Sequence, residues 1–135
     1  MTSRPARMSD YSADVLSRID YDAVRQRRRR NFAAYHEALA AENTFVCELG
    51  PEDAPFCYPF VPRTEFERKR LHERRIFVPM FWPEVNGAPG DVFEFERDFA
   101  RRLLPLPVDQ RYGAEELETV IKAVKAQLGE GRTKA

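Results

Sequence analysis

The chain has 135 residues, of which 43% are hydrophobic and 33% are charged. This length suits one domain with a hydrophobic core and is too short for two ordinary domains, and the composition is that of a globular chain rather than a disordered or membrane-spanning one. The 22 basic residues balance 22 acidic residues, so no net field attracts a nucleic acid or an anionic membrane surface.

The N-terminal part of the chain predicts a tail and two helices. Residues 1–8 are expected to form a linker or tail. Ser9 can cap a short helix that ends near Ser17, and Asp20 can cap a longer helix that reaches about Ala41. A stripe with three-to-four spacing is expected to turn the longer helix toward the protein; it consists of Val24, Arg28, Phe32, Tyr35 and Leu39.

Four consecutive arginines, Arg27 to Arg30, lie on the longer predicted helix. Consecutive helical residues lie about 100° apart, so this run surrounds the helix and forms no continuous basic patch on one face. A solvated helix face with some arginine stems along apolar surface is the expected arrangement.

Two β-type runs follow, residues 44–47 (T-F-V-C) and 56–61 (F-C-Y-P-F-V), and both are predicted strands. A turn-rich segment joins them. Thr64 and Glu67 match a capping box, which predicts a helix from about Glu65 to Arg74.

The stretch 75–85, R-I-F-V-P-M-F-W-P-E-V, is the most distinctive part of the sequence. It begins as a predicted strand at 76–78, and its two prolines lack an amide hydrogen, so the segment should leave the sheet and follow a surface. Side chains alternate on extended backbone, so at least one of Met80, Phe81 and Trp82 should face outward. Outward-facing side chains would meet a ligand or a second protein surface; the alternative is that another layer of the same domain covers all of them.

The C-terminal part predicts two more helices around an extended segment. The first helix is expected from Phe93 to Arg102, and residues 103–107 (L-L-P-L-P) are expected to form an edge strand or extended segment because of their prolines. The last helix is expected to end at Gly129 and has acidic first turns. Its apolar stripe consists of Leu117, Val120, Ile121, Val124 and Leu128.

Helices and short strands thus alternate without an internal repeat. This order predicts an α+β domain with a small, largely antiparallel sheet of three to four strands and helices packed on one face. The single domain is expected to cover residues 9–129, between the N-terminal tail and a C-terminal tail at 130–135.

The cysteines and the hydropathy of the sequence indicate the cellular compartment in which the chain is expected. Cys47 and Cys57 lie on separate β-type runs and form no C-x-x-C pair, so free, buried thiols are expected and a metal site is not. No apolar run reaches the length of a membrane span and no signal-peptide core follows the N-terminus. A cytoplasmic location without membrane contact is expected.

Catalytic motifs are absent from the sequence. It contains no glycine-rich dinucleotide loop, phosphate-binding loop, nucleophile elbow or zinc-protease motif. His36 and His72 are expected to be surface residues. No lysine has the apolar surroundings that would lower its pKa for a Schiff base; the four lysines are Lys69, Lys122, Lys125 and Lys134. The chain alone is therefore expected to have no catalytic, cofactor-binding or metal-binding residues.

A set of motifs in fixed order nevertheless resembles a known family. The motifs are residues 8–16, 19–21 (I-D-Y), 28–32 (R-R-R-N-F), 58–60 (Y-P-F), 76–83 (I-F-V-P-M-F-W-P) and 104–112 (L-P-L-P-V-D-Q-R-Y), followed by a helix. From about Met8 to Leu128 the chain resembles the C-terminal small domain of the DegT-like (DegT/DnrJ) family of pyridoxal-phosphate-dependent sugar aminotransferases.

This resemblance implies a part of a sugar-nucleotide aminotransferase of amino-sugar biosynthesis. In the family, a large domain carries the lysine of the internal aldimine, the acid that pairs with the pyridine nitrogen and most phosphate ligands. Pyridoxal phosphate thus belongs to the full-length family and is not expected on this chain alone. The implied partners are the large cofactor-binding domain, a second protomer, since family members are usually dimers, and a sugar-nucleotide substrate.

The resemblance also implies a site. In the family the small domain helps close the substrate cleft, and residues 78–83 match the segment nearest the sugar nucleotide. The substrate-cleft candidates are Phe77, Met80, Phe81 and Trp82. In relatives a histidine often precedes the tryptophan. Phe81 occupies this position here, so a polar contact with the substrate would be lost.

Two other hypotheses remain open. One is a non-enzymatic interaction module that uses the Phe/Met/Trp patch as a partner-binding surface. The other is nucleic-acid binding through Arg25 and Arg27 to Arg30, which would weaken as salt rises; aromatic residues that stack on bases do not alternate with these arginines.

Overall fold

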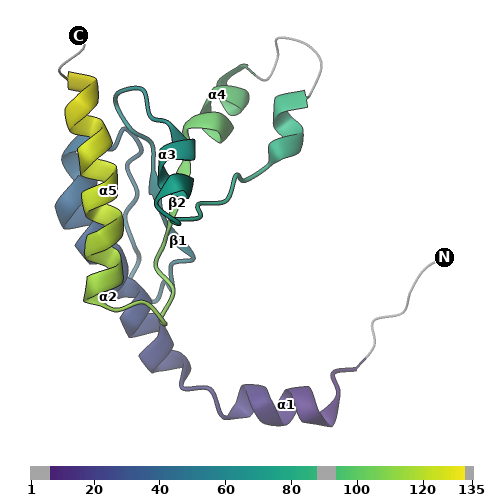
Figure 1. Cartoon of the computed structure of the whole chain (residues 1–135). Coiled ribbons are helices and arrows are strands. Elements are labelled where there is room, and N and C mark those ends of the chain that lie inside the picture. Colours follow the sequence, from purple (N-terminus) through teal and green to yellow (C-terminus); the bar gives the residue numbers. More distant parts are fainter. Residues whose placement is uncertain (1–6, 88–93, 133–135) are drawn as a thin grey trace.

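Two long helices and a short antiparallel strand pair make up the frame of the domain. The computed structural model describes residues 7–87 and 94–132, which form five α-helices, two 3-10 helices and one two-stranded sheet (Figure 1). Helices α2 (Tyr21–Leu39) and α5 (Ala114–Arg132) lie side by side. Figure 1 shows both on one side of the sheet, whereas α4 (Glu94–Arg102) and the 3-10 helix η2 (Pro83–Gly87) lie toward the other side.

The sheet consists of β1 (Cys57–Phe60) and β2 (Leu104–Pro107), paired antiparallel with Tyr58 opposite Leu106. Pro59 and Pro105 face each other in this pair. Prolines are tolerated because each strand of a two-stranded sheet is an edge strand. The prediction of an edge strand at residues 103–107, which was based on the prolines of this segment, is therefore confirmed.

The core forms where α2 and α5 cover this sheet. Aromatic rings fill its centre: Tyr58 stacks on Tyr35 with ring centroids 5.8 Å apart and meets the Phe32 ring edge-on at 5.0 Å. The stripe predicted on α2 is largely confirmed, since Phe32, Tyr35 and Leu39 are buried. The buried cluster is completed mainly by aliphatic side chains: Leu71, Val78, Leu104, Leu106, Val108, Leu117, Val120, Val124 and Leu128.

The N-terminal helices begin where their caps predict. Helix α1 (Asp10–Ser17) starts after Ser9, whose hydroxyl accepts a hydrogen bond from the amide of Ser12 at 3.2 Å. Asp20 caps α2 through the amide of Ala23 at 2.9 Å. Helix α1 buries none of its residues and projects from the rest of the domain (Figure 1).

The prediction of three to four strands is wrong for the described residues, which contain two. The predicted strand at 44–47 is a loop, and an isolated bridge joins Asn43, the residue just before it, to Pro62. The buried Asn43 side chain takes the place of a ladder there: its oxygen accepts from the amides of Phe45 (3.0 Å) and Val61 (2.9 Å). Its nitrogen donates to the carbonyl of Pro59 at 2.8 Å. Side chains that satisfy backbone groups in this way compete with strand pairing.

The predicted helix over 65–74 is shorter than expected. Helix α3 spans Arg68–Glu73, and the capping box at Thr64 and Glu67 does not form. The Glu67 amide donates to the Gln127 side chain at 3.3 Å, and the Thr64 hydroxyl is buried without a hydrogen-bond partner among the described residues. A contact with α5 thus replaces the local cap.

The last helix extends further than expected, whereas the helix before it agrees with the prediction. Helix α5 continues through Gly129 to Arg132, so the predicted tail at 130–135 starts inside the helix. A glycine costs a helix interior only about 1 kcal/mol, and the residues from Ala114 to Leu128 already form a long helix before it. Helix α4 agrees with prediction over 94–102, and Phe93 lies outside the described residues.

We expect Asn43→Ala to lower the free energy of unfolding by roughly 2–4 kcal/mol, because it strips partners from backbone groups around β1. Asn43→Asp is the matched control: it keeps both acceptor contacts, loses the donor and should cost less. Urea unfolding of the three proteins measures both values. Equal stability of Asn43→Ala and wild type would contradict this role.

Candidate functional site

Residues 76–82, here called the arm, connect α3 to η2 and carry all four predicted site residues. Figure 1 shows the arm running from α3 toward η2, away from α5. The predicted strand at 76–78 is wrong, because this segment pairs with no strand of the described residues. The predicted course along a surface outside the sheet is confirmed.

A left-handed turn fixes the start of the arm. Arg75 has φ 60°, and its amide bonds to the His72 carbonyl at 2.9 Å while the Ile76 amide bonds to the Leu71 carbonyl at 2.9 Å. This pattern of two bonds is the Schellman motif, which usually places glycine at the left-handed position. The far end is similar, since Trp82 has φ 51°. Two non-glycine residues in a rarely populated conformation therefore bound the arm.

The Arg68 guanidinium fixes the middle of the arm. It donates to the carbonyls of Val78 (3.2 Å) and Pro79, and its other nitrogen donates to the carbonyl of Leu103 at 2.7 Å. Burial lowers the pKa of Arg68 from its ordinary value, although an arginine side chain stays charged in proteins. Val78 is buried in the core, so the arm is anchored by one buried apolar side chain and one half-buried cation.

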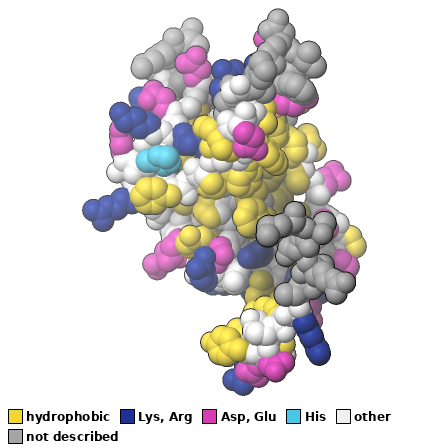
Figure 2. Space-filling view, turned by 90° about the vertical axis from the view of Figure 1, so that its right-hand side faces the viewer, with side chains coloured by type: hydrophobic (Ala, Val, Ile, Leu, Met, Phe, Trp, Pro, Cys, Tyr) yellow, Lys and Arg dark blue, Asp and Glu magenta, His cyan; other side chains and the backbone are white. Residues whose placement is uncertain are grey.

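The arm presents apolar side chains to the outside. Phe77, Met80 and Trp82 are 74%, 43% and 53% exposed, which confirms that at least one large side chain faces outward. Phe81 is half-buried, and its ring lies 5.6 Å from Trp82 and 6.1 Å from the exposed Phe56. Figure 2 views this side of the molecule and shows hydrophobic side chains gathered across the middle of it.

Sequence reasoning missed the aromatic neighbours of the arm. Phe56 was assigned to a strand, but it lies before β1 and extends the patch. A second cluster joins Phe45 to Phe99 at 5.5 Å and Phe99 to Phe95 at 6.3 Å. The high aromatic content of 12% was the available signal, but nothing local tells which rings meet across the fold.

Three arginines of α2, Arg25, Arg28 and Arg29, are engaged in the fold, whereas Arg27 and Arg30 are exposed. Arg29 donates to the carbonyls of Gly50 (2.6 Å) and Asp53 (3.0 Å), and Arg25 pairs with Glu52. These contacts fasten the loop before β1 to α2. These three arginines are already committed to the protein, so fewer cations are available for nucleic-acid phosphates, which weakens the nucleic-acid hypothesis.

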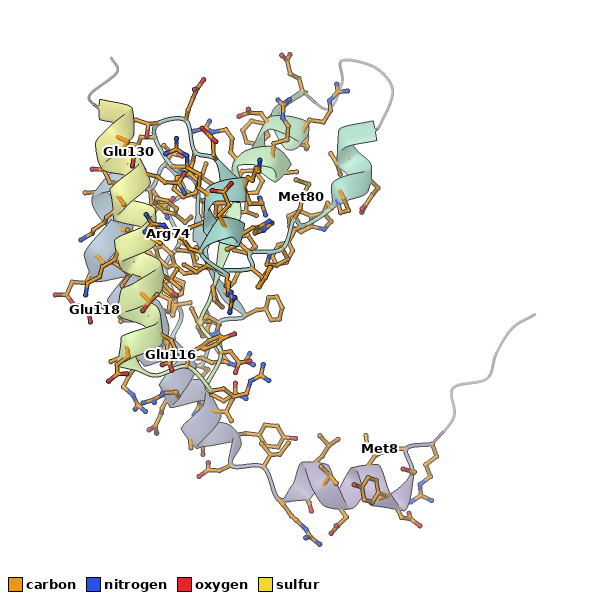
Figure 3. All side chains as sticks on the ribbon, viewed as in Figure 1. Met8, Arg74, Met80, Glu116, Glu118 and Glu130 are labelled. Atoms are coloured by element: carbon orange, nitrogen blue, oxygen red, sulfur yellow. The ribbon has the colours of Figure 1, made fainter. Side chains whose placement is uncertain are left out.

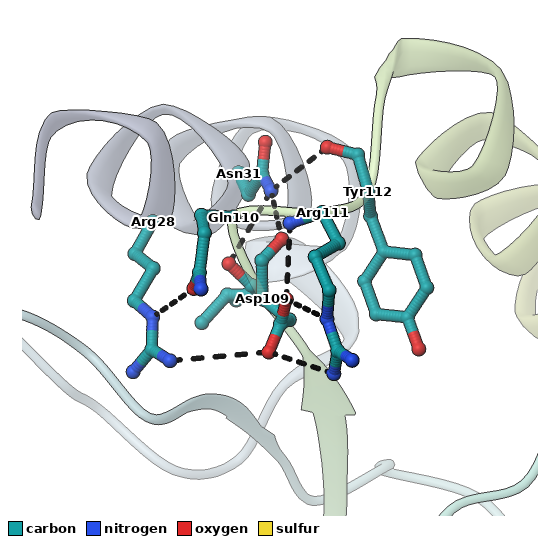
Figure 4. A network of polar contacts seen from close by, with 7 residues as sticks. Arg28, Asn31, Asp109, Gln110, Arg111 and Tyr112 are labelled. Atoms are coloured by element: carbon teal, nitrogen blue, oxygen red, sulfur yellow. Dashed lines mark hydrogen bonds and ion pairs between the residues drawn. The ribbon is translucent and has the colours of Figure 1, made fainter. Parts of the chain in front are cut away.

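A polar network joins two of the sequence motifs that lie 77 to 82 positions apart (Figure 4). The buried Asn31 donates to the carbonyls of Val108 (3.3 Å) and Asp109 (2.9 Å). Arg28 donates to Gln110 at 2.9 Å. Hydrogen bonds from Arg111 hold the pKa of Asp109 below its usual value. The motif at 28–32 therefore holds the turn at 108–112 against α2.

Groups with catalytic potential are not assembled in the described residues. His36 and His72 are exposed as predicted, and no cluster of metal-ligating side chains forms there. Both cysteines are free, as predicted, but half-buried rather than buried. The pKa of Cys57 is raised to about 11, mainly by burial and to a smaller extent by the neighbouring Cys47. Its nucleophilic thiolate form is therefore scarce at neutral pH.

Comparisons with protein-family models, with curated proteins and with solved structures find no match to this chain. Within residues 7–87 and 94–132, no helix combines the length and the apolar character needed to cross a membrane.

We expect Arg75→Gly to raise the free energy of unfolding by about 1 kcal/mol, because glycine adopts the left-handed conformation without the steric cost of a side chain. Arg74→Gly is the control: this neighbour has a negative φ of −90°, which any residue adopts, so glycine there should destabilise the protein. Chemical denaturation of both variants gives the answer. A loss of stability in Arg75→Gly would show that the Arg75 side chain matters more than its backbone strain.

Proposed function

We propose that this chain acts as the C-terminal small domain of a DegT-like sugar-nucleotide aminotransferase and helps close the substrate cleft of a large cofactor-binding domain. The observation that carries the proposal is the arm, which presents Phe77, Met80 and Trp82 outward on fixed backbone. Its role in amino-sugar biosynthesis, the pairing with a second protomer and a cytoplasmic location belong to the same proposal.

The arm has the properties of a docking surface. Contiguous exposed apolar side chains commonly mark interaction sites, and aromatic residues often dominate their binding energy. Arg68 and the two left-handed residues hold the arm in place before a partner arrives. A pre-ordered surface loses less conformational entropy on binding.

The polar network at 108–112 is a second observation that supports the resemblance. Two motifs that carry the resemblance, 28–32 and 104–112, are joined through Asn31 and Arg28. These motifs then have a shared structural purpose, the placement of the turn that leads into α5. The motif at 76–83 remains as the one with outward-facing side chains.

The described residues do not fit pyridoxal phosphate. Lys69, Lys122 and Lys125 are exposed, and Lys122 pairs with Glu118 at 2.8 Å. None has the sheltered apolar surroundings that an aldimine-forming lysine needs. The role proposed for the chain is therefore to bind a large domain and to wall off its cleft from water, with Phe77, Met80, Phe81 and Trp82 as the wall.

A non-enzymatic interaction module is the second candidate. It is favoured by α1, which projects from the domain, buries none of its residues and exposes Tyr11 and Val15. Such a module would use the same patch around Trp82 but would not require a cofactor-binding partner.

We expect the chain to bind the large domain of a DegT-like sugar aminotransferase that is loaded with pyridoxal phosphate, and Trp82→Ala to weaken this binding at least tenfold. Loss of a central aromatic anchor commonly has such an effect. Tyr21→Ala is the matched control, because Tyr21 is a comparably exposed aromatic residue outside the arm. Sedimentation velocity measures both. Self-association through Trp82 without any binding to the large domain would favour the interaction module instead.

The chain alone should form no stable aldimine with added pyridoxal phosphate, because its described lysines are solvent-exposed. Absorbance spectra of the mixture, recorded with and without borohydride reduction, test this. A stable aldimine band that disappears on changing one lysine would overturn the assignment as a cleft-closing domain without its own cofactor site.

A further inference from the structure

A cavity of about 310 Å³ lies between the start of the arm, the end of β2 and the first turns of α5. We call it the Tyr35 cavity. Most of its wall is apolar and includes Ile76, Leu117 and Val120. Its volume is at the lower end of the range for ligand pockets, which suits a molecule with a single ring.

Tyr35 lines this cavity and carries an unsatisfied polar group. Its side chain is 0% exposed and lines the cavity, and its hydroxyl has no hydrogen-bond partner among the described residues. Buried hydroxyl groups almost always have a partner, because an unsatisfied one is destabilising. Burial, and secondarily the neighbouring Tyr112, raise the pKa of Tyr35 above its ordinary value, so the hydroxyl remains a neutral donor.

Two arginines give the mouth of the cavity a positive charge. Arg74 and Arg75 line it and are exposed, and neither side chain forms an ion pair or hydrogen bond within the described part of the chain. Figure 3 shows Arg74 between α3 and α5, with Glu116 nearer the start of α5. Glu116 is already engaged, because its carboxylate accepts from the Gly113 amide at 2.8 Å.

Two other hollows lined by described residues, one around Thr64 and one around His36, lack this combination. The one around Thr64 also contains a buried hydroxyl without a partner, but its arginines are committed to the fold. Arg102, for example, donates to the Pro62 carbonyl at 2.7 Å, and Arg68 holds the arm. The Tyr35 cavity alone among these combines free cations with a fully buried donor.

We propose that the Tyr35 cavity binds a small carboxylic acid with a compact apolar body and a polar oxygen at its far end. The carboxylate meets Arg74 and Arg75, the body packs against Ile76, Leu117 and Val120, and the distal oxygen accepts a hydrogen bond from Tyr35. This site lies on the α5 side of the arm, and the inference does not rest on the proposed docking function.

Three probes separate the parts of this site: 4-hydroxyphenylacetate, phenylacetate without the distal oxygen, and 4-hydroxyphenylacetamide without the charge. Titration of the isotope-labelled full chain, followed by amide chemical shifts, should show saturable changes around Tyr35, Ile76 and Leu117 with 4-hydroxyphenylacetate. Each of the other two probes should bind about tenfold more weakly, the usual effect of losing one good polar contact.

Matched variants assign each contact. Tyr35→Phe should reduce the affinity for 4-hydroxyphenylacetate about tenfold and leave that for phenylacetate unchanged. It should not destabilise the free protein, because the hydroxyl has no partner to lose. Arg74→Gln combined with Arg75→Gln should reduce the affinity for the acid to that for the amide, whereas Arg27→Gln, on an exposed position of α2, should change nothing.

Absence of saturable shifts with 4-hydroxyphenylacetate would overturn the inference. So would affinities that are the same in wild type and Tyr35→Phe, or a clear loss of stability in Tyr35→Phe. These outcomes are independent of large-domain docking, which depends on Trp82 and not on Tyr35.

Discussion

The contacts of the half-buried Arg68 guanidinium are the interaction on which the exposed face of this domain depends. The guanidinium satisfies the carbonyls of Val78, Pro79 and Leu103, so it ties the arm to the residue just before β2. Hydrogen bonds from a charged donor are stronger than those between neutral groups. They fix backbone that has no strand partner and that contains a proline unable to donate to one. The side chains of the arm are thereby left to face outward.

The rest of the domain serves as a rigid support for this arrangement. Tyr58 at the centre of the core joins β1 to α2, and Asn31 fixes the turn at 108–112 from the same helix. Left-handed backbone at Arg75 and Trp82 stores strain at both ends of the arm. Strain of this kind persists only where the surroundings over-determine the conformation, and it is often found where a protein binds a ligand or partner.

Local signals in the sequence predicted much of the frame. Helix caps at Ser9 and Asp20, the apolar stripe of α5 and the proline-bearing edge strand were all readable because neighbours in sequence decide them. The sequence did not indicate that the segments 44–47 and 76–78 form no strands. This outcome depends on Asn43 and Arg68, whose side chains satisfy backbone groups 10 to 35 positions away. The outward course of the arm followed from its prolines.

The same difference between local and long-range contacts decides which candidate sites could be predicted. Exposure of Met80 and Trp82 was predictable from alternation on extended backbone. The Tyr35 cavity was not, because it forms only where α2, the start of the arm, the end of β2 and α5 meet, and a helix stripe gives no sign that the Tyr35 hydroxyl lacks a partner.

Hydrogen exchange of the chain, free and mixed with a pyridoxal-phosphate-loaded large domain of a DegT-like aminotransferase, tests the central claim most directly. If the arm is the docking surface, amides of residues 76–85 gain protection while those of the exposed helix α1 keep their free rates. Protection that appears on α1 and leaves residues 76–85 unchanged would contradict the account.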